Sequence, residues 1–325
     1  MNKIFWRNKK VLITGFEGFL GSNLTKTLLA TKAKVVGLDI KTHREATILC
    51  HADYRNIVDY KGSVTNYKLL QEILQKHSID VIFHLAAEAI VNLSQEKPRK
   101  AFESNIKGTW TVLEAARQYG SIEAVIVASS DKAYGSHKKL PYREGTPLVA
   151  NHPYDVSKSC ADFIAHTYAH SYGLPVAITR CGNIFGPGDF NLSRIIPDAI
   201  KCALTEKEFL IRSDGKFTRD YVYVDDIVNG YIVLAEKLNK LRLSGEAFNF
   251  SNESPLTVIE VVKEISNATG NKLQYKILNN AKYEIKHQYL ESQKSKNILG
   301  WQPRHTFNQG IHKTIQWFKS YETES

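Results

Sequence analysis

The sequence has few cysteines, and they are not arranged to bind a metal or to form a disulfide framework. Its 325 residues contain four, namely Cys50, Cys160, Cys181 and Cys202. None belongs to a Cys-x-x-Cys pair, and no histidine cluster lies near them at the spacing of zinc ligands. We therefore expect buried, reduced thiols, a reducing compartment and no bound metal.

Long hydrophobic runs are also absent. The first apolar stretch, 11–14, ends at Gly15 and is far too short for the core of a signal peptide. No other run approaches the roughly 20 residues that a membrane-spanning helix needs. We expect a cytoplasmic protein that has no membrane partner.

Clustered positive charge is missing too, although the net charge is +10. Lysines and arginines are scattered, and the densest run, 7–10, is short and directly precedes an apolar stretch. Proteins that bind nucleic acid usually carry a basic stripe, so we do not expect nucleic acid as a partner. The positive field would instead attract a small anionic ligand.

Short apolar runs rich in β-branched residues alternate with helical patterns in the first half of the chain. Continuous apolar strands between helices predict a parallel sheet covered on both faces, which is the doubly wound, Rossmann-type α/β fold. The predicted strands are 11–14, 34–38, 81–85, 124–128 and 176–179, and the predicted helices between them are 21–32, 69–77, 105–119 and 153–172.

After residue 182 the pattern is less regular, which predicts a smaller α/β domain interleaved with the first. Two domains suit a chain of this length. The later predicted helices are 195–204, 226–238, 258–269 and 308–320, and the later strands are 221–224 and 247–250. We assign 1–183 to the first domain, to which 217–243 returns, and 184–325 to the second, mainly 184–216 and 244–325.

A glycine-rich turn follows the first strand and opens the first helix. Gly15, Gly18 and Gly21 permit a tight turn whose backbone N–H groups approach a pyrophosphate at the helix N-terminus. A plain strand-to-helix turn would not need three glycines at this spacing. Asp39 ends the second strand and would accept hydrogen bonds from ribose hydroxyls, which favours NAD over NADP. Arg44 lies nearby and would soften that preference.

Tyr154 and Lys158 lie four residues apart on a predicted helix and therefore share one face. A tyrosine ordinarily titrates at about pH 10, but a nearby ammonium and a positive nicotinamide both favour the phenolate, which would act as a base. Ser130 follows the strand 124–128, at the edge where open parallel sheets bind ligands. The alternatives are a surface Tyr–Lys pair and a serine that caps a helix.

Together these residues resemble the extended short-chain dehydrogenase family of nucleotide-sugar epimerases and dehydratases. The resemblance covers nearly the whole chain and includes 14–21, 84–87, Asn105, 129–130, 154–158, 180–183, 186–188, 219–225 and 299–303. In this family the residue after the active-site serine or threonine separates the reactions. The 4,6-dehydratases carry an aspartate there, which matches Asp131 and implies a general acid for the departing hydroxyl on carbon 6.

Lys132 departs from the commonest dehydratase pattern. Most of these enzymes follow the aspartate with a glutamate, the base for the proton on carbon 5, whereas a minority branch that includes dehydratases of CDP-glucose has Ser-Asp-Lys. Two interpretations stay open for Lys132. Desolvation lowers its pKa enough for it to act as the base, or it stabilises an enolate while another group removes the proton.

The resemblance also implies the residues that contact the ligands. Contacts with NAD are expected from Gly15, Gly18, Phe19, Leu20, Gly21, Asp39, Ser63, Val64, Leu85, Ala86, Ala87, Asn105, Tyr154 and Lys158. The aspartate that the family usually has at position 63, for a contact with adenine, is missing. Contacts with the substrate are expected from Glu88, Ser130, Asn183, Arg194, Arg212 and Arg219.

Four of these substrate contacts have a more specific expected role. Asn183 and Arg219 resemble residues that hold the diphosphate, and the planar guanidinium of Arg219 suits paired phosphate oxygens. Arg194 and Arg212 would bind the same charge or the nucleotide base, and the alternative for each is a surface salt bridge.

The expected reaction is a redox-neutral dehydration of a nucleoside-diphosphate hexose, with oxidation at carbon 4, loss of water across carbons 5 and 6 and return of hydride to carbon 6. The chain as a whole most resembles GDP-N-acetylglucosamine 4,6-dehydratases of bacterial legionaminic acid synthesis, and Ser-Asp-Lys makes CDP-glucose the second choice. A 4-epimerase and an inactive cofactor-sensing protein are the alternative functions. The helices 105–119 and 153–172 resemble those that form a four-helix bundle between two subunits, which implies a homodimer.

Overall fold

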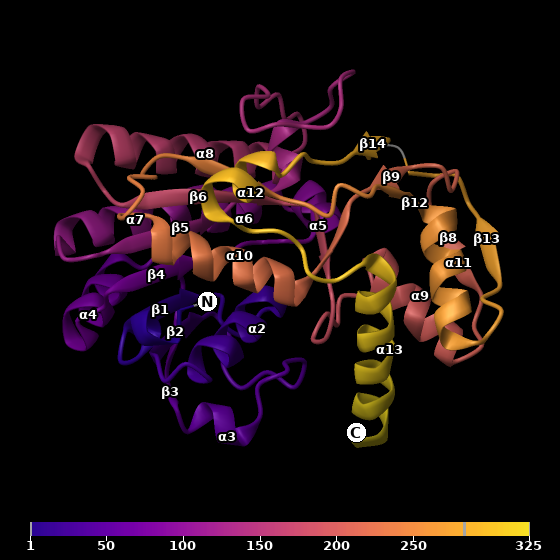
Figure 1. Cartoon of the computed structure of the whole chain (residues 1–325), viewed down its shortest axis with the longest axis horizontal. Helices are drawn as coiled ribbons and strands as arrows, with labels where there is room; N and C mark the ends of the chain where they lie inside the picture. The colour runs from indigo at the N-terminus through magenta and orange to yellow at the C-terminus, as the bar shows by residue number, and fades with distance from the viewer. Residues whose placement is uncertain (1, 282–283, 325) are drawn as a thin grey trace.

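A computed structural model describes residues 2–281 and 284–324. At its centre is a seven-stranded sheet in the order β11-β6-β5-β4-β1-β2-β3, in which every pairing is parallel (Figure 1). The predicted Rossmann-type fold is therefore confirmed. The strands are β1 (Lys10–Thr14), β2 (Lys34–Asp39), β3 (Ile57–Lys61), β4 (Val81–His84), β5 (Ala124–Ala128), β6 (Val176–Cys181) and β11 (Ala247–Phe250).

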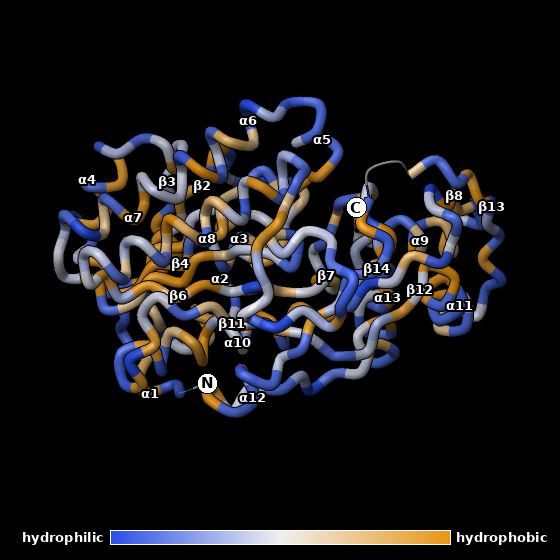
Figure 2. Tube along the Cα trace, turned by 90° about the horizontal axis from the view of Figure 1, so that it is seen from above, coloured by the Kyte–Doolittle hydropathy of each residue, from blue (hydrophilic) through white to orange (hydrophobic). Residues whose placement is uncertain are grey.

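Helices cover both faces of this sheet. In β1, Val11 and Ile13 belong to one buried cluster and Leu12 to the other, because successive side chains of a strand point to opposite faces. Burial on both faces explains why the strands are uninterrupted apolar runs, and the sheet is the most hydrophobic part of the chain in Figure 2. One face is covered by α2 (Phe19–Leu29) and α10 (Val224–Lys237), the other by α4 (Tyr67–His77), α7 (Gly108–Tyr119) and α8 (Pro153–Tyr172).

The strand order places β1 beside β4, so the connections run in opposite directions from this point. In an open parallel sheet, ligands bind outside the carboxyl ends of the strands at such a reversal. The glycine turn after β1, 85–87 after β4 and 129–132 after β5 all lie at this edge. The fold therefore gathers residues that the sequence places in three separate motifs.

A second, smaller lobe lies beside this edge of the sheet (Figure 1). Its short strands pair as β7 (Asn183–Phe185) with β10 (Tyr221–Tyr223), β9 (Thr218–Arg219) with β12 (Leu256–Thr257) and β14 (His287–Gln288), and β8 (Phe209–Ile211) with β13 (Tyr275–Ile277). Its helices are α9 (Ile195–Leu204), α11 (Val258–Thr269) and α13 (Phe307–Glu324).

The structure differs from the sequence expectations in two parts of the main sheet. Strand β3 has no counterpart among the predicted strands, because it is an edge strand of mixed polarity with only one fully buried residue. Strand β11 pairs with β6, although the predicted boundary puts 247–250 in the second domain. Nothing in the local pattern of a short apolar strand tells which sheet it will join.

Several short helical segments are also absent from the sequence expectations. The predicted helix 105–119 is α-helical only from Gly108, and a single π-helical turn precedes it. Such turns often mark functional sites, and this one carries Asn105. The unpredicted segments are α1 (Lys3–Trp6), α3 (His51–Tyr54), α5 (Val91–Glu96), α6 (Pro98–Phe102), the 3₁₀ turn η2 (Asp131–Tyr134) and α12 (Gln293–Leu299), and the π-helical turn η1 (Glu103–Lys107) begins two residues before the predicted helix.

The four cysteines are free, but burial holds for only one of them. Cys181 is buried, Cys160 and Cys202 are half-buried, and Cys50 is exposed. The prediction of buried thiols is therefore wrong for Cys50, which stands at the start of the short surface helix α3. Within the described ranges, no three His, Cys, Asp or Glu side chains come together as metal ligands would.

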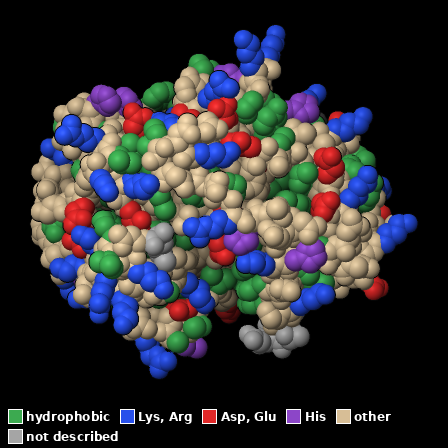
Figure 3. Space-filling view, viewed as in Figure 1, with side chains coloured by type: hydrophobic (Ala, Val, Ile, Leu, Met, Phe, Trp, Pro, Cys, Tyr) green, Lys and Arg blue, Asp and Glu red, His purple; other side chains and the backbone are tan. Residues whose placement is uncertain are grey.

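Two further findings concern the surface. On the face shown in Figure 3, lysines and arginines are spread among acidic and neutral side chains and form no continuous stripe. In the part of the chain that the structure describes, none of the helices combines the length and the apolar character needed to cross a bilayer.

Candidate active site

The glycine turn between β1 and α2 packs so closely on the end of β4 that side chains would not fit. A Cβ on Gly15, whose φ is +73°, would lie 2.9 Å from the Cα of Ala86, and one on Gly21 would lie 2.0 Å from the carbonyl oxygen of Gly15. Helix α2 begins at Phe19, and none of the side chains that the structure describes caps it. Its first turn therefore presents backbone N–H groups and a positive dipole end to an anion, as a dinucleotide pyrophosphate requires.

Asp39 ends β2 next to this turn. Its carboxylate accepts hydrogen bonds from the backbone N–H of Glu17 (3.4 Å) and from the guanidinium of Arg44 (2.5 Å). Arg44 is therefore paired with the acid. Farther along this edge, the Ser63 hydroxyl lies 2.8 Å from that of Thr65, and Val64 is buried.

The segment after β4 is held by a histidine that stays neutral. His84 Nδ1 lies 2.8 Å from the Thr14 hydroxyl and its Nε2 lies 3.2 Å from the Thr109 hydroxyl. Burial, aided by the charge of Lys158, lowers the pKa of His84 to about 3. The Thr14 hydroxyl also accepts the N–H of Ala86 (3.3 Å), so β1 and the 85–87 segment are fixed together.

Asn105 joins three segments at the same edge. Its side-chain oxygen accepts the N–H of Glu88 (2.7 Å), and its nitrogen donates to the Glu88 carbonyl (3.1 Å) and the Ser157 hydroxyl (2.9 Å). The Glu88 carboxylate itself pairs with Lys100 (3.0 Å). Asn105 therefore positions the start of the 88–90 segment against α8.

The turn η2 presents Ser130, Asp131 and Lys132 beyond the end of β5. The Ser130 hydroxyl caps the turn by accepting the Lys132 N–H (3.2 Å), and it donates to Asp131 Oδ1 (3.0 Å). Ser130 therefore caps the turn, which was the alternative to a role in the site, and it also contacts the Asp131 carboxylate. Asp131 is buried, and no described group donates a hydrogen bond to its Oδ2. One carboxyl oxygen is thus left to interact with a ligand.

Tyr154 and Lys158 face this turn from α8. Lys158 is buried and donates to the Ala128 carbonyl (2.7 Å), and its ammonium lies 5.9 Å from the centre of the Tyr154 ring, which excludes an exposed surface pair. Burial raises the pKa of Tyr154 to about 12, against the effects of the Arg194 charge and a hydrogen bond with Ser130. The phenol therefore needs further positive charge before it can act as a base near neutral pH.

Two buried carboxyl groups join the cluster that the sequence did not single out. Burial raises the pKa of Asp155 to about 6, and the Lys132 charge works against that rise. Burial also raises the pKa of Asp220 to about 7, although Ser251 donates a hydrogen bond to it. Each has one buried oxygen for which no described group is a partner. The only sequence signal is that each directly follows a predicted site residue.

Asn183 and Arg219 enter the site from the second lobe. Asn183 of β7 lies opposite Tyr221 of β10 in the strand register. Burial raises the pKa of Tyr221, and a hydrogen bond with the Asn183 side chain partly offsets that rise. Arg219 is buried, donates to the Lys286 carbonyl (3.2 Å) and lies 3.5 Å from the Glu284 carboxylate. Its charge also depresses the pKa of Lys132, so the two cations are near each other.

The remaining two arginines differ in their relation to this cluster. Arg194 pairs with the buried carboxylate of Asp189 (3.2 Å), and its charge also acts on Tyr154. Arg212 is exposed. Burial raises the pKa of Asp198, and the nearby charge of Arg212 only partly offsets that rise. No contact in the described ranges joins Arg212 to the turn η2 or to α8. The structure thus gathers five of the six predicted substrate contacts around the sheet edge and leaves Arg212 on the outer lobe.

Comparison with known proteins agrees with this geometry. The family profile of GDP-mannose 4,6 dehydratase matches residues 12–314. A CDP-glucose 4,6-dehydratase of Salmonella typhimurium is 28% identical over 99% of this chain and 93% of its own length.

Solved structures are similar over the whole fold. A dTDP-glucose 4,6-dehydratase from Bacillus anthracis in complex with NAD has a TM-score of 0.86 and 30% identity, covering 97% of this chain and 98% of that one. A UDP-glucose 4-epimerase from Thermotoga maritima, with UDP-glucose, has a TM-score of 0.88 and 28% identity, covering 96% and 99%. Overall similarity therefore does not separate the two reactions.

The buried Lys158 makes stability depend on pH. Burial lowers its pKa to about 8, although Asp162 opposes the shift. An unfolded lysine titrates at about 10.4, so between these values the unfolded chain binds a proton that the folded chain does not. We expect stability to rise with pH in this window, by up to about 1.4 kcal/mol per pH unit.

The measurement is urea unfolding of the wild type and of Lys158→Met from about pH 7 to 9.5. The free energy of unfolding of the wild type should gain on that of the variant as pH rises. Lys263→Met, at an exposed position, is the control and should follow the wild type. A constant difference between wild type and Lys158→Met would contradict the buried, destabilised ammonium.

Proposed function

Because the chain belongs to the GDP-mannose 4,6 dehydratase family, we propose that it is an NAD-dependent 4,6-dehydratase of a nucleoside-diphosphate hexose. One observation carries the choice of reaction: the buried Asp131 lies beside Ser130 and has one carboxyl oxygen without a hydrogen-bond partner among the described residues. A 4-epimerase needs no acid at this point, whereas elimination of a hydroxyl from carbon 6 does.

The residues around the glycine turn suit NAD. The close packing of Gly15 and Gly21 leaves backbone N–H groups for the pyrophosphate, and Asp39 offers a carboxylate to the ribose hydroxyls. Phe19, Leu20, Ser63, Val64, 85–87 and Asn105 complete the proposed contacts. Bound NAD⁺ supplies an acceptor that takes hydride from carbon 4 and returns it at carbon 6, and a positive charge that favours ionisation of Tyr154.

Oxidation at carbon 4 is assigned to Tyr154. As a phenolate it takes the proton of the carbon 4 hydroxyl while hydride leaves the same carbon. Ser130 is within hydrogen-bonding reach of Tyr154 and orients that hydroxyl, and Lys158 lies 5.9 Å from the phenol ring. The ketone formed at carbon 4 makes the proton on carbon 5 acidic.

Loss of water is assigned to the other side of the cluster. Asp131 protonates the hydroxyl that leaves carbon 6, and the carbon 5 proton goes to Lys132 or to Asp155. Burial lowers the pKa of Lys132 and raises that of Asp155 to about 6, so both groups are shifted toward the pH at which a base is useful. As hydride returns to carbon 6, the base or the solvent returns a proton to carbon 5, so the net reaction releases one water and leaves the cofactor unchanged.

The second lobe is assigned to the nucleotide. Arg219, Asn183 and Arg194 are proposed to bind the diphosphate, with the exposed Arg212 and, from the first lobe, Glu88 as further proposed contacts. We propose GDP-N-acetylglucosamine as the substrate on the overall resemblance of the chain. CDP-glucose is the alternative, and the Ser-Asp-Lys sequence and the CDP-glucose 4,6-dehydratase relative support it.

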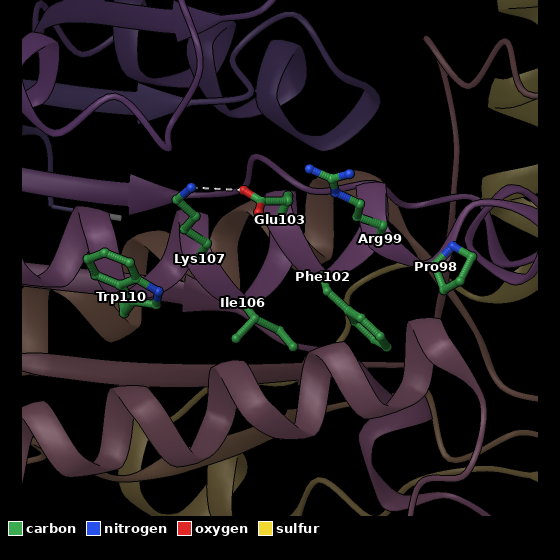
Figure 4. A pocket seen from close by; sticks show the side chains of 7 residues that line it. All are labelled: Pro98, Arg99, Phe102, Glu103, Ile106, Lys107 and Trp110. Carbon is green, nitrogen blue, oxygen red and sulfur yellow. Dashed lines mark ion pairs between the residues drawn. The ribbon is translucent and has the colours of Figure 1, made fainter.

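We also propose that two copies pair through α7 and α8. Phe102 of α6, Trp110 of α7 and Phe163 of α8 are exposed by 37%, 41% and 59%, and apolar side chains gathered on one surface can mark a subunit contact. Figure 4 shows Phe102 and Ile106 on the side of the helical run away from the ion pair between Lys107 and Glu103. A matching surface on a second copy would bury them in a four-helix bundle.

The first test of the reaction is incubation with GDP-N-acetylglucosamine, CDP-glucose, UDP-glucose and dTDP-glucose in deuterated water. We expect a 4-keto-6-deoxy product with deuterium at carbon 5, detected by NMR and by the ultraviolet band of 4-keto sugars in alkali. GDP-N-acetylglucosamine should give the highest kcat/KM and CDP-glucose the next. A 4-epimer without loss of water would overturn the dehydratase assignment.

Asp131→Asn tests the assigned acid. The amide cannot protonate the departing hydroxyl, so we expect product formation to fall by about 10²- to 10⁴-fold. Oxidation at carbon 4 should persist, so a 4-keto sugar that keeps its carbon 6 hydroxyl should accumulate and be seen by mass spectrometry. Asp214→Asn, in the second lobe, is the control. Wild-type turnover by Asp131→Asn would remove Asp131 from the mechanism.

Trp110→Glu tests the subunit contact, because burying the new carboxylate in an apolar interface is costly. We expect light scattering to give the mass of a dimer for the wild type and of a monomer for the variant. Leu210→Glu is the matched control, since Leu210 is an exposed apolar residue (47%) of β8, far along the chain in the second lobe. Equal masses for all three proteins would contradict the proposed interface.

A further inference from the structure

The Lys132 side chain is held by a residue from the second lobe. Its ammonium donates a hydrogen bond to Gln288 Oε1, and the nitrogen of the same amide donates to the carbonyl of Asp131 (2.8 Å). Gln288 is completely buried. A single side chain therefore contacts both Asp131 and Lys132 of the Ser-Asp-Lys turn, although Gln288 lies 156 positions after Lys132 in the chain.

The position of Gln288 links this contact to the proposed phosphate site. Gln288 lies on β14, which runs parallel to β9, and its partner in the register is Arg219. Arg219 is further tied to this strand pair by its hydrogen bond to the Lys286 carbonyl (3.2 Å). The residue that holds Lys132 and the arginine proposed for the diphosphate are thus neighbours on one small sheet.

The chemistry of an amide suits this position. The negative charges of Asp131, Asp155 and Glu284 raise the pKa of Lys132, and the positive charge of Arg219 lowers it. An amide oxygen accepts from the ammonium without adding another charge, and the amide nitrogen can at the same time donate to the Asp131 carbonyl. With both ends engaged, the orientation of the amide is fixed.

We propose that Gln288 is a positioning residue for the dehydration, which holds the Lys132 ammonium beside Asp131 and ties both to the strand pair that carries Arg219. The inference rests on the proposed function. Gln288 does not act on the sugar itself. It fixes where Lys132 stands when the diphosphate is bound on β9, so its loss is expected to lower kcat and to leave KM nearly unchanged.

The activity test compares Gln288→Met, which keeps the length but removes both hydrogen bonds, with His287→Ala at the adjacent exposed position. We expect kcat of Gln288→Met to fall by about 100-fold, the cost of a misplaced group, and that of His287→Ala to stay at the wild-type value. In a Lys132→Met background the change at Gln288 should lower kcat much less, because one of its two hydrogen-bond partners is already lost. Circular dichroism and urea unfolding verify that each variant is folded.

A second variant gives a readout that a merely structural role would not move. Gln288→Glu places a carboxylate against the ammonium, which should raise the pKa of Lys132. The limb of the pH–rate profile set by Lys132 should therefore move to higher pH. The same shift should appear without substrate in the NMR titration of lysine labelled with nitrogen-15 at Nζ, with the Lys132 signal assigned from Lys132→Met.

The outcomes separate the inference from the function on which it rests. If the wild type converts none of the sugars, the proposed function fails and the role of Gln288 in dehydration falls with it. If the wild type is active but folded Gln288→Met keeps its kcat, or Gln288→Glu leaves the Lys132 titration unchanged, the positioning role alone is overturned. A fall in kcat that is equally large in the Lys132→Met background also overturns it.

Discussion

The site depends on how α8 is fixed against the carboxyl end of β5. Asp162 of α8 accepts a hydrogen bond from the Ser129 hydroxyl (2.5 Å) and forms a buried ion pair with Arg180 of β6 (2.8 Å). Lys158 and Ser159 of the same helix donate to the carbonyls of 128 and 133 (2.7 and 2.9 Å). These contacts set the separation between the phenol on the helix and the acid on the turn. Breaking a buried pair leaves an uncompensated charge, at a cost of about 3–5 kcal/mol, so this arrangement has little freedom to change.

Burial at this edge of the sheet shifts the pKa values of several ionisable side chains. Burial shifts the pKa of Tyr154 to about 12 and that of Lys158 to about 8, because it disfavours the charged form of each group. It also raises the pKa of Asp155 to about 6, near the value useful for a base. The surroundings of these groups, more than their identity, therefore determine what each contributes to the proposed chemistry.

The two lobes are in contact at the turn η2, where Gln288 of the second lobe hydrogen-bonds with Lys132 and Asp131. Ser130, Asp131 and Lys132 are part of the Rossmann lobe, while the amide that holds Lys132 comes from β14, which pairs with the strand of Arg219. A change in the second lobe on binding a diphosphate would therefore reach the turn through one buried side chain. This gives the proposed specificity for the nucleotide a direct physical connection to the proposed chemistry on the sugar.

The sequence by itself determined the features that depend on neighbouring residues. Three glycines after an apolar strand require a tight turn, Asp39 ends the next strand, and the spacing of Tyr154 and Lys158 puts them on one helix face. The Rossmann-type sheet follows from apolar runs alternating with helical patterns. Only the tertiary structure decided that β11 joins this sheet, that Cys50 is exposed, and that Asp155 and Asp220 are buried beside the site. It alone brought Gln288 to Lys132, because contacts across 156 residues depend on the packing of whole lobes, which leaves no periodic or local pattern in the chain.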